Sequence, residues 1–374
     1  MDIQRGFGDH PLMSRIRILW ALSFCLASVP DARAQSISLT EVQRKKLAKL
    51  VEQDPEAKAL FAPLKQSADA ALKDAPDPIE RIQSEGKLKD DPAKIRTQAC
   101  MKDMKKLHAL GFAYAVTADA RYPDKAREFI LAWAKVNRSA GDPIDDTGLE
   151  PLITAYDLAR GRFPEKDRAA VDGWLRTVAE AERKSFKAGT STSVNNWHSH
   201  RLKIVGLIAF LLQDKGLIDY VTGAYKDHVG KNLNPDGSSL DFHERDALHY
   251  HTYDLEPLLT LAIAARQNGI DLYGFRADTG GTLEKSVRFL VPYCDGSKTH
   301  AEFVKSKVAF DRKRAESGDD RYKAGRPFEP AEGAGVLELA AAFDGSLTRL
   351  LIQVKRSPAK AYPTWQTVLN AARK

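Results

Sequence analysis

Residues 107–136, LHALGFAYAVTADARYPDKAREFILAWAKV, carry the spacing that decides the fold. Their large apolar side chains recur mostly at intervals of three and four residues, which places them on one face of a helix. These side chains are Leu107, Leu110, Phe112, Tyr114, Val116, Phe129, Ile130, Trp133 and Val136. The same spacing continues along most of the chain, and patterns typical of β-strands are scarce. The stretch therefore predicts a protein built from paired helices.

Short segments rich in Gly, Pro, Asn and Asp interrupt this pattern, and such segments favour turns. They occupy residues 137–143, 161–164, 189–196, 234–237 and 295–297. One sequence echo indicates a repeated unit: TGLEPLIT at 147–154 resembles YDLEPLLT at 253–260, and in both we expect the proline near a helix start.

We therefore expect residues 35–374 to form a single all-α domain, an (α/α) toroid of helical hairpins around a central substrate groove. Residues 35–94 are more polar, and we expect them to form capping helices on this body. The alternative is a pair of helical bundles.

The first 34 residues have the pattern of a signal peptide. Arg15 and Arg17 precede an apolar run over residues 18–29, and Ala32-Arg33-Ala34 has the small-x-small form of a cleavage site. The run is shorter than the roughly 20 residues that a membrane span needs. We expect export to the periplasm or beyond, with no membrane attachment after cleavage.

The charge balance favours an anionic partner. The chain has 57 Lys and Arg against 50 Asp and Glu, a net charge of +7. Nucleic acid is disfavoured because no run of basic residues interleaved with aromatics is present. An anionic polysaccharide fits the positive net charge and the expected location outside the cytoplasm better. The oligomeric state is left open, with a monomer as one option.

Two cysteines, Cys100 and Cys294, remain after Cys25 leaves with the signal peptide. In an oxidising compartment they could form one disulfide. The alternative is two buried thiols.

Two polar clusters hold the chemistry of the chain. One is SLDFHERDALHYHTYDLEPLL at 239–259, and the other is NNWHSHR at 195–201. Together they contain five of the nine histidines, beside arginine, tyrosine and carboxylate side chains. A surface that only contacts solvent does not need this combination of residues. We interpret them as two walls of one active site.

Tyr250 is the leading catalytic candidate. It stands between His249 and His251, ahead of a helix expected to begin near Leu255. A phenol can give and take a proton, and a nearby arginine can lower its pKa enough to make tyrosinate available. Arg245 is the nearest candidate for that arginine. The alternative is a half-buried tyrosine with a bonded hydroxyl.

Asn195 and Asn196 supply neutral amide donors at a loop-to-helix junction, where paired asparagines are otherwise a cap and a turn. Trp197 offers a face for a sugar ring, and His198 and His200 place imidazoles near the same point. The second wall adds His243 as a further imidazole.

A metal site and a serine triad are two alternatives to this interpretation. The pairs His198-x-His200 and His249-x-His251 offer four imidazoles, but their spacing matches no zinc motif. No Gly-x-Ser-x-Gly elbow is present, so a Ser-His-Asp hydrolase is disfavoured. We expect no metal and no cofactor.

Four stretches resemble the alginate lyase family of polyuronate lyases. They are GDPIDDTGLEPL at 141–152 with YDL at 156–158, the Asn195-Asn196 loop, NPDGS at 234–238 and ALHYH at 247–251. The resemblance covers roughly residues 99–266 and implies a helical-toroid enzyme of the bacterial periplasm. Two departures suggest a divergent branch: Trp197 stands where the family has a histidine, and the family's arginine slot reads Phe242-His243.

The resemblance implies β-elimination of a β-1,4-linked polyuronate, either mannuronate-rich alginate or glucuronan, giving 4,5-unsaturated ends. Asn196 would neutralise the substrate carboxylate, and Tyr250 would protonate the leaving oxygen and also remove the C5 proton when both lie on one face of the sugar. His198, His200 and Arg245 are the other catalytic candidates. The candidates for substrate binding are Asn195, Trp197, Arg201, His243, His249, His251 and Glu150.

Two alternatives remain open at this point. One is a glycoside hydrolase on a helical toroid that uses a carboxylate pair such as Glu150 and Asp241. The other is a periplasmic protein that binds polyuronate without cleaving it. The preferred uronic acid and the endo or exo mode of cleavage are also open.

Overall fold

The computed structural model describes residues 36–374, which lie in one compact unit spanning Ala34–Lys374. The expected signal peptide lies outside the described residues. Helices make up the described part, which contains isolated β-bridges and no β-strand. The longer helices are α1 (Glu41–Gln53), α2 (Pro55–Ala71), α3 (Pro92–Cys100), α4 (Lys102–Thr117), α5 (Arg121–Val136), α7 (Glu150–Ala159), α8 (Glu165–Ser185), α9 (Asn196–Leu212), α10 (Lys215–Asn232), α12 (Leu248–Gln267) and α13 (Leu283–Cys294).

Shorter elements complete the unit. They are α6 (Pro143–Asp146), η1 (Thr147–Leu149), η2 (Arg160–Arg162), η3 (Ser191–Ser193), α11 (Leu240–Arg245), α14 (Ala309–Glu316), η4 (Asp320–Tyr322), η5 (Pro330–Gly333), α15 (Ala334–Ala340), α16 (Leu347–Val354) and α17 (Trp365–Arg373).

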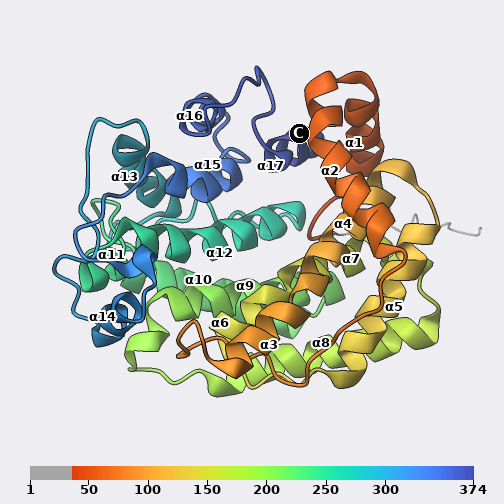
Figure 1. Cartoon of the computed structure of the whole chain (residues 1–374), viewed down its shortest axis with the longest axis horizontal. Helices are drawn as coiled ribbons and strands as arrows, with labels where there is room; N and C mark the ends of the chain where they lie inside the picture. Colours follow the sequence, from red (N-terminus) through yellow and green to blue (C-terminus); the bar gives the residue numbers. More distant parts are fainter. Residues whose placement is uncertain (1–35) are drawn as a thin grey trace, which may run out of the picture. The chain divides into compact units, whose positions relative to one another are not determined.

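The innermost helices are α9 and α12, which pack against each other along their lengths (Figure 1). Every residue of α9 except Trp197 and Leu212 is buried, as expected for a helix that is surrounded on all sides. Gly206 allows the close approach, because a Cβ there would lie 2.3 Å from Cδ1 of Leu261. These two helices form the base on which the polar clusters are placed.

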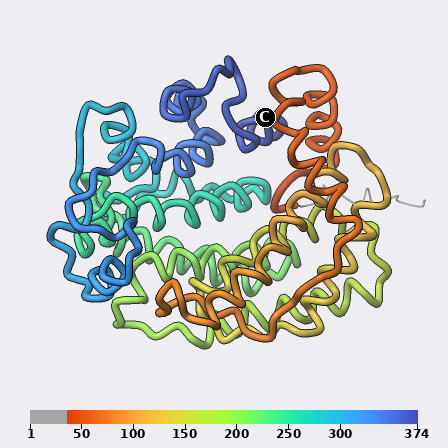
Figure 2. Tube along the Cα trace, viewed as in Figure 1, coloured from red at the N-terminus to blue at the C-terminus, as the bar shows by residue number. Residues whose placement is uncertain are grey.

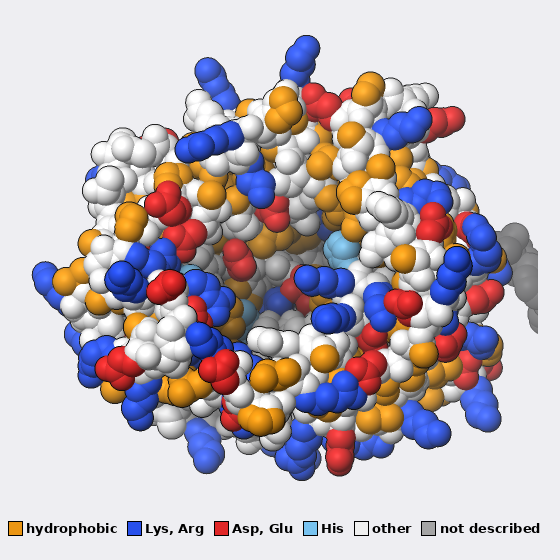
Figure 3. Space-filling view, viewed as in Figure 1, with side chains coloured by type: hydrophobic (Ala, Val, Ile, Leu, Met, Phe, Trp, Pro, Cys, Tyr) orange, Lys and Arg blue, Asp and Glu red, His pale blue; other side chains and the backbone are white. Residues whose placement is uncertain are grey.

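The other helices surround this pair as hairpins. Helix α4 packs on α7, α7 on α9, and α12 on α15, while α5, α8, α10, α13 and α16 cover the outside. The outer helix α8 buries a single stripe that includes Val171, Leu175 and Val178. An inner layer covered by an outer layer of paired helices confirms the predicted all-α toroid, and Figure 3 shows a hollow near the centre of the face in view, with charged and histidine side chains inside it.

The two ends of the described chain meet and close the ring. Helix α17 packs on α1 and α2, and both of these pack on α4. Figure 2 shows the red and blue parts of the trace side by side. Both N-terminal helices lie within residues 35–94, where helices were expected, and begin at strong caps: Thr40 forms a capping box with Gln43, and Asp54 accepts from the N–H groups of Glu56 and Ala57.

The predicted start of the helix after Tyr250 is wrong. Helix α12 begins at Leu248, so Tyr250 lies in its first turn and Pro257 lies in its interior. The carboxylate of Glu302 accepts from the backbone N–H groups of Leu248 and His249, at 2.8 and 3.0 Å, and so satisfies the helix start. The sequence echo therefore holds for Pro151, at the start of α7, and fails for Pro257.

The disulfide considered from the sequence is not formed. Cys100 and Cys294 are both free and buried, and burial raises the pKa of their thiols to about 11 and about 12.

Within residues 36–374, no helix combines the length and the apolar composition that crossing a membrane would require.

Candidate active site

A pocket of about 240 Å³ brings the two predicted polar clusters together. Its walls come from five parts of the chain: the segment 84–94, α6, the start of α9, the junction of α11 with α12, and the segment from α14 to η4. The lining residues are Ser84, Glu85, Lys94, Ile144, Asn196, Trp197, Arg245, His249, Tyr250, Tyr253, Arg314, Arg321 and Tyr322. Five of the predicted site residues are among them: Asn196, Trp197, Arg245, His249 and Tyr250.

The first wall is set by the start of α9. The side chain of Asn195 caps this helix by accepting from the N–H of Trp197 at 3.1 Å, and Asn195 does not line the pocket. Asn196 does line it, and the carboxylate of Asp241 accepts from both its backbone N–H, at 2.8 Å, and its side-chain amide. Within residues 36–374 that amide makes no other hydrogen bond, so its second N–H is available to a ligand.

Asp241 belongs to a buried network behind this wall. Asp254 accepts from Ser199 at 2.6 Å and from the side-chain amide of Asn232 at 2.7 Å. Burial raises the pKa of Asp241 well above its ordinary value, and the nearby Asp254 raises it further. Burial also raises the pKa of Asp254 to about 7. Asp241, the acceptor that holds Asn196, is therefore buried and cannot exchange this hydrogen bond for one with solvent.

The second wall is a helix, a sharp turn and another helix. Ser239 caps α11, Asp246 adopts a left-handed conformation with φ of 48°, and α12 follows. The carbonyl of Asp246 accepts from the N–H of Phe303 at 2.7 Å, which fastens the later chain to this turn. Phe303 packs with Ala247 and Tyr250. The turn aims the first residues of α12 into the pocket.

Tyr250 contacts two arginines in different ways. The hydroxyl of Tyr250 accepts a hydrogen bond from Nη1 of Arg314 at 2.8 Å. The guanidinium of Arg245 instead lies over the ring, 3.8 Å from its centroid, and pairs with Asp311 at 2.6 Å. The positive charge of Arg245 lowers the pKa of Tyr250, as expected from the sequence, whereas the hydrogen bond to the hydroxyl comes from Arg314, which the sequence did not indicate.

The expectation that tyrosinate is readily available is nevertheless wrong for the free protein. Burial raises the pKa of Tyr250 well above its ordinary value of about 10, although Arg245 and Arg314 both oppose the shift. The phenol therefore carries its proton at neutral pH, which suits a proton donor.

His249 is the histidine that lines the pocket. Its ring lies at 5.2 Å from that of Tyr250, centroid to centroid, and neither ring nitrogen makes a hydrogen bond within the described residues. Burial lowers the pKa of His249 to about 4, with Arg326 and Arg321 adding to the shift and Glu332 opposing it. The imidazole is therefore neutral near pH 7 and able to accept a proton.

Cations and aromatic rings make up much of the remaining lining. Lys94 approaches from α3, and burial together with the charges of Arg314 and Arg321 lowers its pKa. Tyr253 and Tyr322 add two ring faces beside Trp197. A pocket with several cations and flat ring faces is suited to an anionic sugar.

The remaining predicted histidines lie away from the pocket lining. His198 packs against Phe186 and His228, and burial lowers its pKa to about 3. His200 lies behind Tyr253, with Nδ1 bonded to Thr147 at 2.8 Å. The helical geometry of α9 explains why neither histidine lines the pocket. Asn196 and Trp197 face the pocket, whereas the side chains of His198 and His200 point into the protein interior.

Two histidines of the second cluster are also directed elsewhere. His243 bonds to Ser238 at 2.8 Å. His251 is fully buried between Ser239, at 2.9 Å, and the carbonyl of Ser286, at 3.0 Å, so its ring nitrogens are both satisfied. Both residues thus have hydrogen-bond partners within the protein, and neither lines the pocket of Tyr250.

The two predicted charged residues outside the pocket form ion pairs. Arg201 is buried and donates to Glu182 at 3.2 Å. Glu150 accepts from Lys203 at 2.5 Å and lines a separate cavity of about 90 Å³. Asp241, its proposed partner in a hydrolase, lines neither this cavity nor the pocket of Tyr250. Residues 36–374 also contain no group of three or more His, Cys, Asp or Glu side chains placed to hold a metal ion.

The pocket contains functional candidates that the sequence analysis missed. Tyr253 follows Tyr250 by three residues, and helical spacing places the two on one face. This spacing is visible in the sequence, but a helix expected to begin near Leu255 leaves both tyrosines outside it. Arg314, Arg321 and Tyr322 gave no local signal, because they reach the pocket only through the fold.

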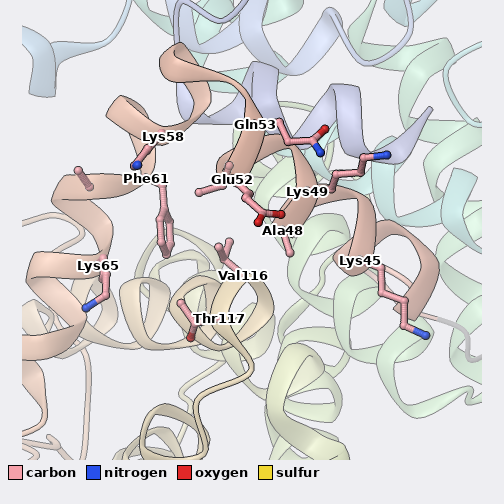
Figure 4. A pocket seen from close by; sticks show the side chains of 12 residues that line it. Lys45, Ala48, Lys49, Glu52, Gln53, Lys58, Phe61, Lys65, Val116 and Thr117 are labelled. Atoms are coloured by element: carbon pink, nitrogen blue, oxygen red, sulfur yellow. The ribbon is translucent and has the colours of Figure 1, made fainter.

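A larger groove lies apart from this chemistry. It has a volume of about 800 Å³ and lies between α1, α2 and the end of α4 (Figure 4). Phe61 and Val116 lie among its lining residues, and Lys45, Lys49, Lys58 and Lys65 stand around it. It has neither a histidine nor a tyrosine, so we assign the chemistry to the smaller pocket.

Comparisons with known proteins identify one family. The family model for alginate lyase matches residues 42–300. An alginate lyase of Stenotrophomonas maltophilia strain K279a is 25% identical over 213 residues, which cover 50% of this chain and 27% of that relative. The matched stretch thus spans about a quarter of the relative's length.

Solved structures of alginate lyases share the fold. One from Bacteroides ovatus has a TM-score of 0.65 at 19% identity and covers 90% of this chain and 98% of its own. Alginate lyase A1-III from Sphingomonas species A1 has a TM-score of 0.58 at 18% identity, covering 84% and 90%. Variants of A1-III complexed with tetrasaccharide match with a TM-score of 0.57 at 19% identity.

Proposed function

Because the chain belongs to the alginate lyase family, we propose that it is a polysaccharide lyase that cleaves a β-1,4-linked polyuronate by β-elimination. The observation that carries the proposal is the pocket in which Tyr250, His249 and Asn196 meet a set of arginine and lysine side chains. Mannuronate-rich alginate and glucuronan are the two proposed substrates. The tetrasaccharide complexes of A1-III support an oligosaccharide or polysaccharide as the substrate.

The first role in the reaction is to neutralise the substrate carboxylate. The free N–H of the Asn196 amide is directed by Asp241, and a neutral donor on the carboxylate makes the proton at C5 more acidic. Each preorganised donor on a developing charge contributes about 2.7–4 kcal/mol. Lys94 and Arg321 add positive charge at the pocket wall.

The second role is proton removal, which we assign to His249. Its pKa of about 4 keeps the imidazole neutral, whereas Tyr250 still carries its proton at neutral pH. His249 takes the C5 proton, and the electron pair left on C5 forms the C4–C5 double bond. This assignment replaces the double role of Tyr250 implied by the family resemblance.

The third role is protonation of the leaving group, which we assign to Tyr250. As the bond between C4 and the glycosidic oxygen breaks, that oxygen takes the phenolic proton and leaves as a hydroxyl. Trp197, Tyr253 and Tyr322 offer ring faces that hold the sugars in place. The products are an unsaturated uronate end and a new chain end.

The test is to incubate the purified protein with alginate, polymannuronate and glucuronan and to follow the ultraviolet absorbance of the new double bond. The proposal predicts a rise with at least one of the three. New reducing ends without absorbance would instead identify a hydrolase, and binding without any product would identify a passive polyuronate-binding protein. Either result overturns the proposal.

Export to the periplasm is part of the same proposal and rests on the pattern of residues 15–34. Amino-terminal sequencing of the protein recovered from a periplasmic extract tests it. We expect a mature chain that begins near Gln35, and an intact leader on the recovered protein contradicts the proposed export.

A further inference from the structure

Arg314 makes a direct contact with the proposed proton donor. Its Nη1 donates to the hydroxyl oxygen of Tyr250 at 2.8 Å. A guanidinium has donors and no acceptor, so the phenol oxygen must accept in this hydrogen bond. The phenolic hydrogen is then left to point elsewhere, and within residues 36–374 it has no other partner. The contact therefore leaves that hydrogen free to face a ligand in the pocket.

The guanidinium of Arg314 is held firmly in this position. Its side chain is only 13% exposed, and its central carbon lies 4.8 Å from the ring centroid of Tyr322 and 4.5 Å from that of Phe310. The nearest carboxylates are Glu85 at 3.6 Å and Asp311 at 4.0 Å. Both distances are longer than that of the hydrogen bond to Tyr250.

The carboxylate of Asp311 makes its shorter hydrogen bonds with residues other than Arg314. It accepts from Arg245 at 2.6 Å and from Ser306 at 2.8 Å. Among the contacts of the guanidinium of Arg314, the shortest is thus the one with the phenol oxygen, and the positive charge is placed where a tyrosinate would form. Arg245, which faces the ring and not the hydroxyl, cannot supply this hydrogen bond.

Arg314 lies outside the stretch that the family model matches, which ends at residue 300. The slot where the sequence resemblance places an arginine reads Phe242-His243, and His243 bonds to Ser238. The chain thus brings an arginine to the tyrosine from α14, a segment fastened to the pocket through Phe303 and Asp246.

We propose that Arg314 is the positioning residue of the proton donor: it directs the hydroxyl hydrogen of Tyr250 into the pocket and stabilises the tyrosinate left after proton transfer. The inference rests on the proposed function. In the step concerned, the O–H bond of Tyr250 breaks, the leaving glycosidic oxygen gains that proton, and the electron pair of the broken bond stays on the phenol oxygen beside the guanidinium. Water then returns a proton to the tyrosinate.

The kinetic test compares Arg314→Gln and Arg314→Lys with the matched control Arg312→Gln. Arg312 is a neighbour on α14 whose guanidinium makes one long, exposed contact, to the carbonyl of Ser306 at 3.4 Å. Loss of a donor on a developing charge lowers turnover by about 10²–10³-fold. We expect kcat of Arg314→Gln to fall by that amount with little change in KM, partial recovery in Arg314→Lys, and wild-type kcat in Arg312→Gln.

A second substrate separates positioning from general damage. A uronate oligosaccharide with fluoride at C4 has a leaving group that needs little protonation. On this substrate the difference between wild type and Arg314→Gln should largely disappear. An equal loss on both substrates would show that Arg314 serves the structure alone.

A spectroscopic test does not depend on activity. Replacement of Tyr250 by a fluorinated tyrosine lowers the pKa of the phenol and gives a fluorine signal for its titration. We expect this pKa to rise when Arg314→Gln removes the cation and to rise less in Arg314→Lys. An unchanged titration overturns the inference even if the enzyme is an active lyase, whereas absent lyase activity with a shifted titration overturns the proposed function alone.

Discussion

The carboxylate of Asp241 holds Asn196 at two points, the backbone N–H at 2.8 Å and the side-chain amide. A carboxylate that accepts both donors fixes the plane of the amide and leaves its second N–H toward the pocket. Asn196→Ala should therefore lower kcat by about 10²–10³-fold, the usual effect of removing one donor on a developing charge. Steady-state kinetics on polymannuronate measure this, and a loss confined to KM would contradict the assigned role.

Asp241 itself should act on activity through Asn196. Asp241→Asn keeps the shape but replaces one acceptor by a donor, so we expect lower kcat together with a loss of about 1–3 kcal/mol in the free energy of unfolding. Ser199→Ala is the matched control, because it removes the 2.6 Å bond to Asp254 in the same network without touching Asn196. It should lower stability and leave kcat near wild type.

The pH dependence of activity should report His249. Because its pKa is about 4 in the free protein, kcat/KM should hold down to about that pH and fall only below it. An unperturbed imidazole would instead give a fall near 6.5. His249→Gln should remove most of the turnover. Retention of wild-type turnover in this variant would move the proton-accepting role back to Tyr250.

The same pKa shift has a consequence for stability. The unfolded imidazole titrates near 6.5 and the folded one near 4, so the unfolded state binds more protons between these values. The contribution of His249 to stability is complete above about pH 6.5 and is lost as the pH falls through about 4. Melting curves of wild type and His249→Gln should converge toward the acid end of this window.

The helical toroid was predictable because its signal is repeated along the whole chain. The apolar spacing of residues 107–136 recurs in most helices, and the turn segments mark their ends. The start of α12 was not predictable in this way, because it depends on Glu302, which caps Leu248 from 54 residues away. A distant cap leaves no local pattern.

The candidate site was predictable only in part, for the same reason. Asn196, Trp197 and Tyr250 lie in local clusters rich in polar chemistry, and they do meet in one pocket. His198, His200 and His251 share those clusters, but helical geometry turns them into the protein. Arg314 reaches Tyr250 across 64 residues, through contacts such as the bond of Phe303 to Asp246 and the ion pair of Asp311 with Arg245.

The cations of the pocket should govern binding of an anionic substrate. Lys94→Met and Arg321→Gln should each raise KM and weaken its dependence on salt, because fewer charges then attract the polymer. Lys58→Met, in the groove of Figure 4, removes the same charge far from the assigned chemistry and should leave KM unchanged. Equal effects of all three variants would show that only net charge matters.

The two thiols should be inert in the native protein. Burial raises the pKa of both Cys100 and Cys294, and both are free. We expect reducing agent to leave the melting temperature unchanged, and a thiol reagent to label both cysteines only after denaturation. A lower melting temperature in reducing agent would indicate a disulfide and contradict the structure.

The most direct test of the central claim is the turnover of Tyr250→Phe on polymannuronate, followed by the ultraviolet absorbance of the unsaturated product. The change removes one hydroxyl and leaves the ring that packs against Phe303 and Ala247 in place. If Tyr250 protonates the leaving oxygen, kcat falls by about 10²–10⁴-fold while the variant folds and still binds the polymer. A folded variant that keeps more than about a tenth of the wild-type turnover, well short of that range, would contradict the account.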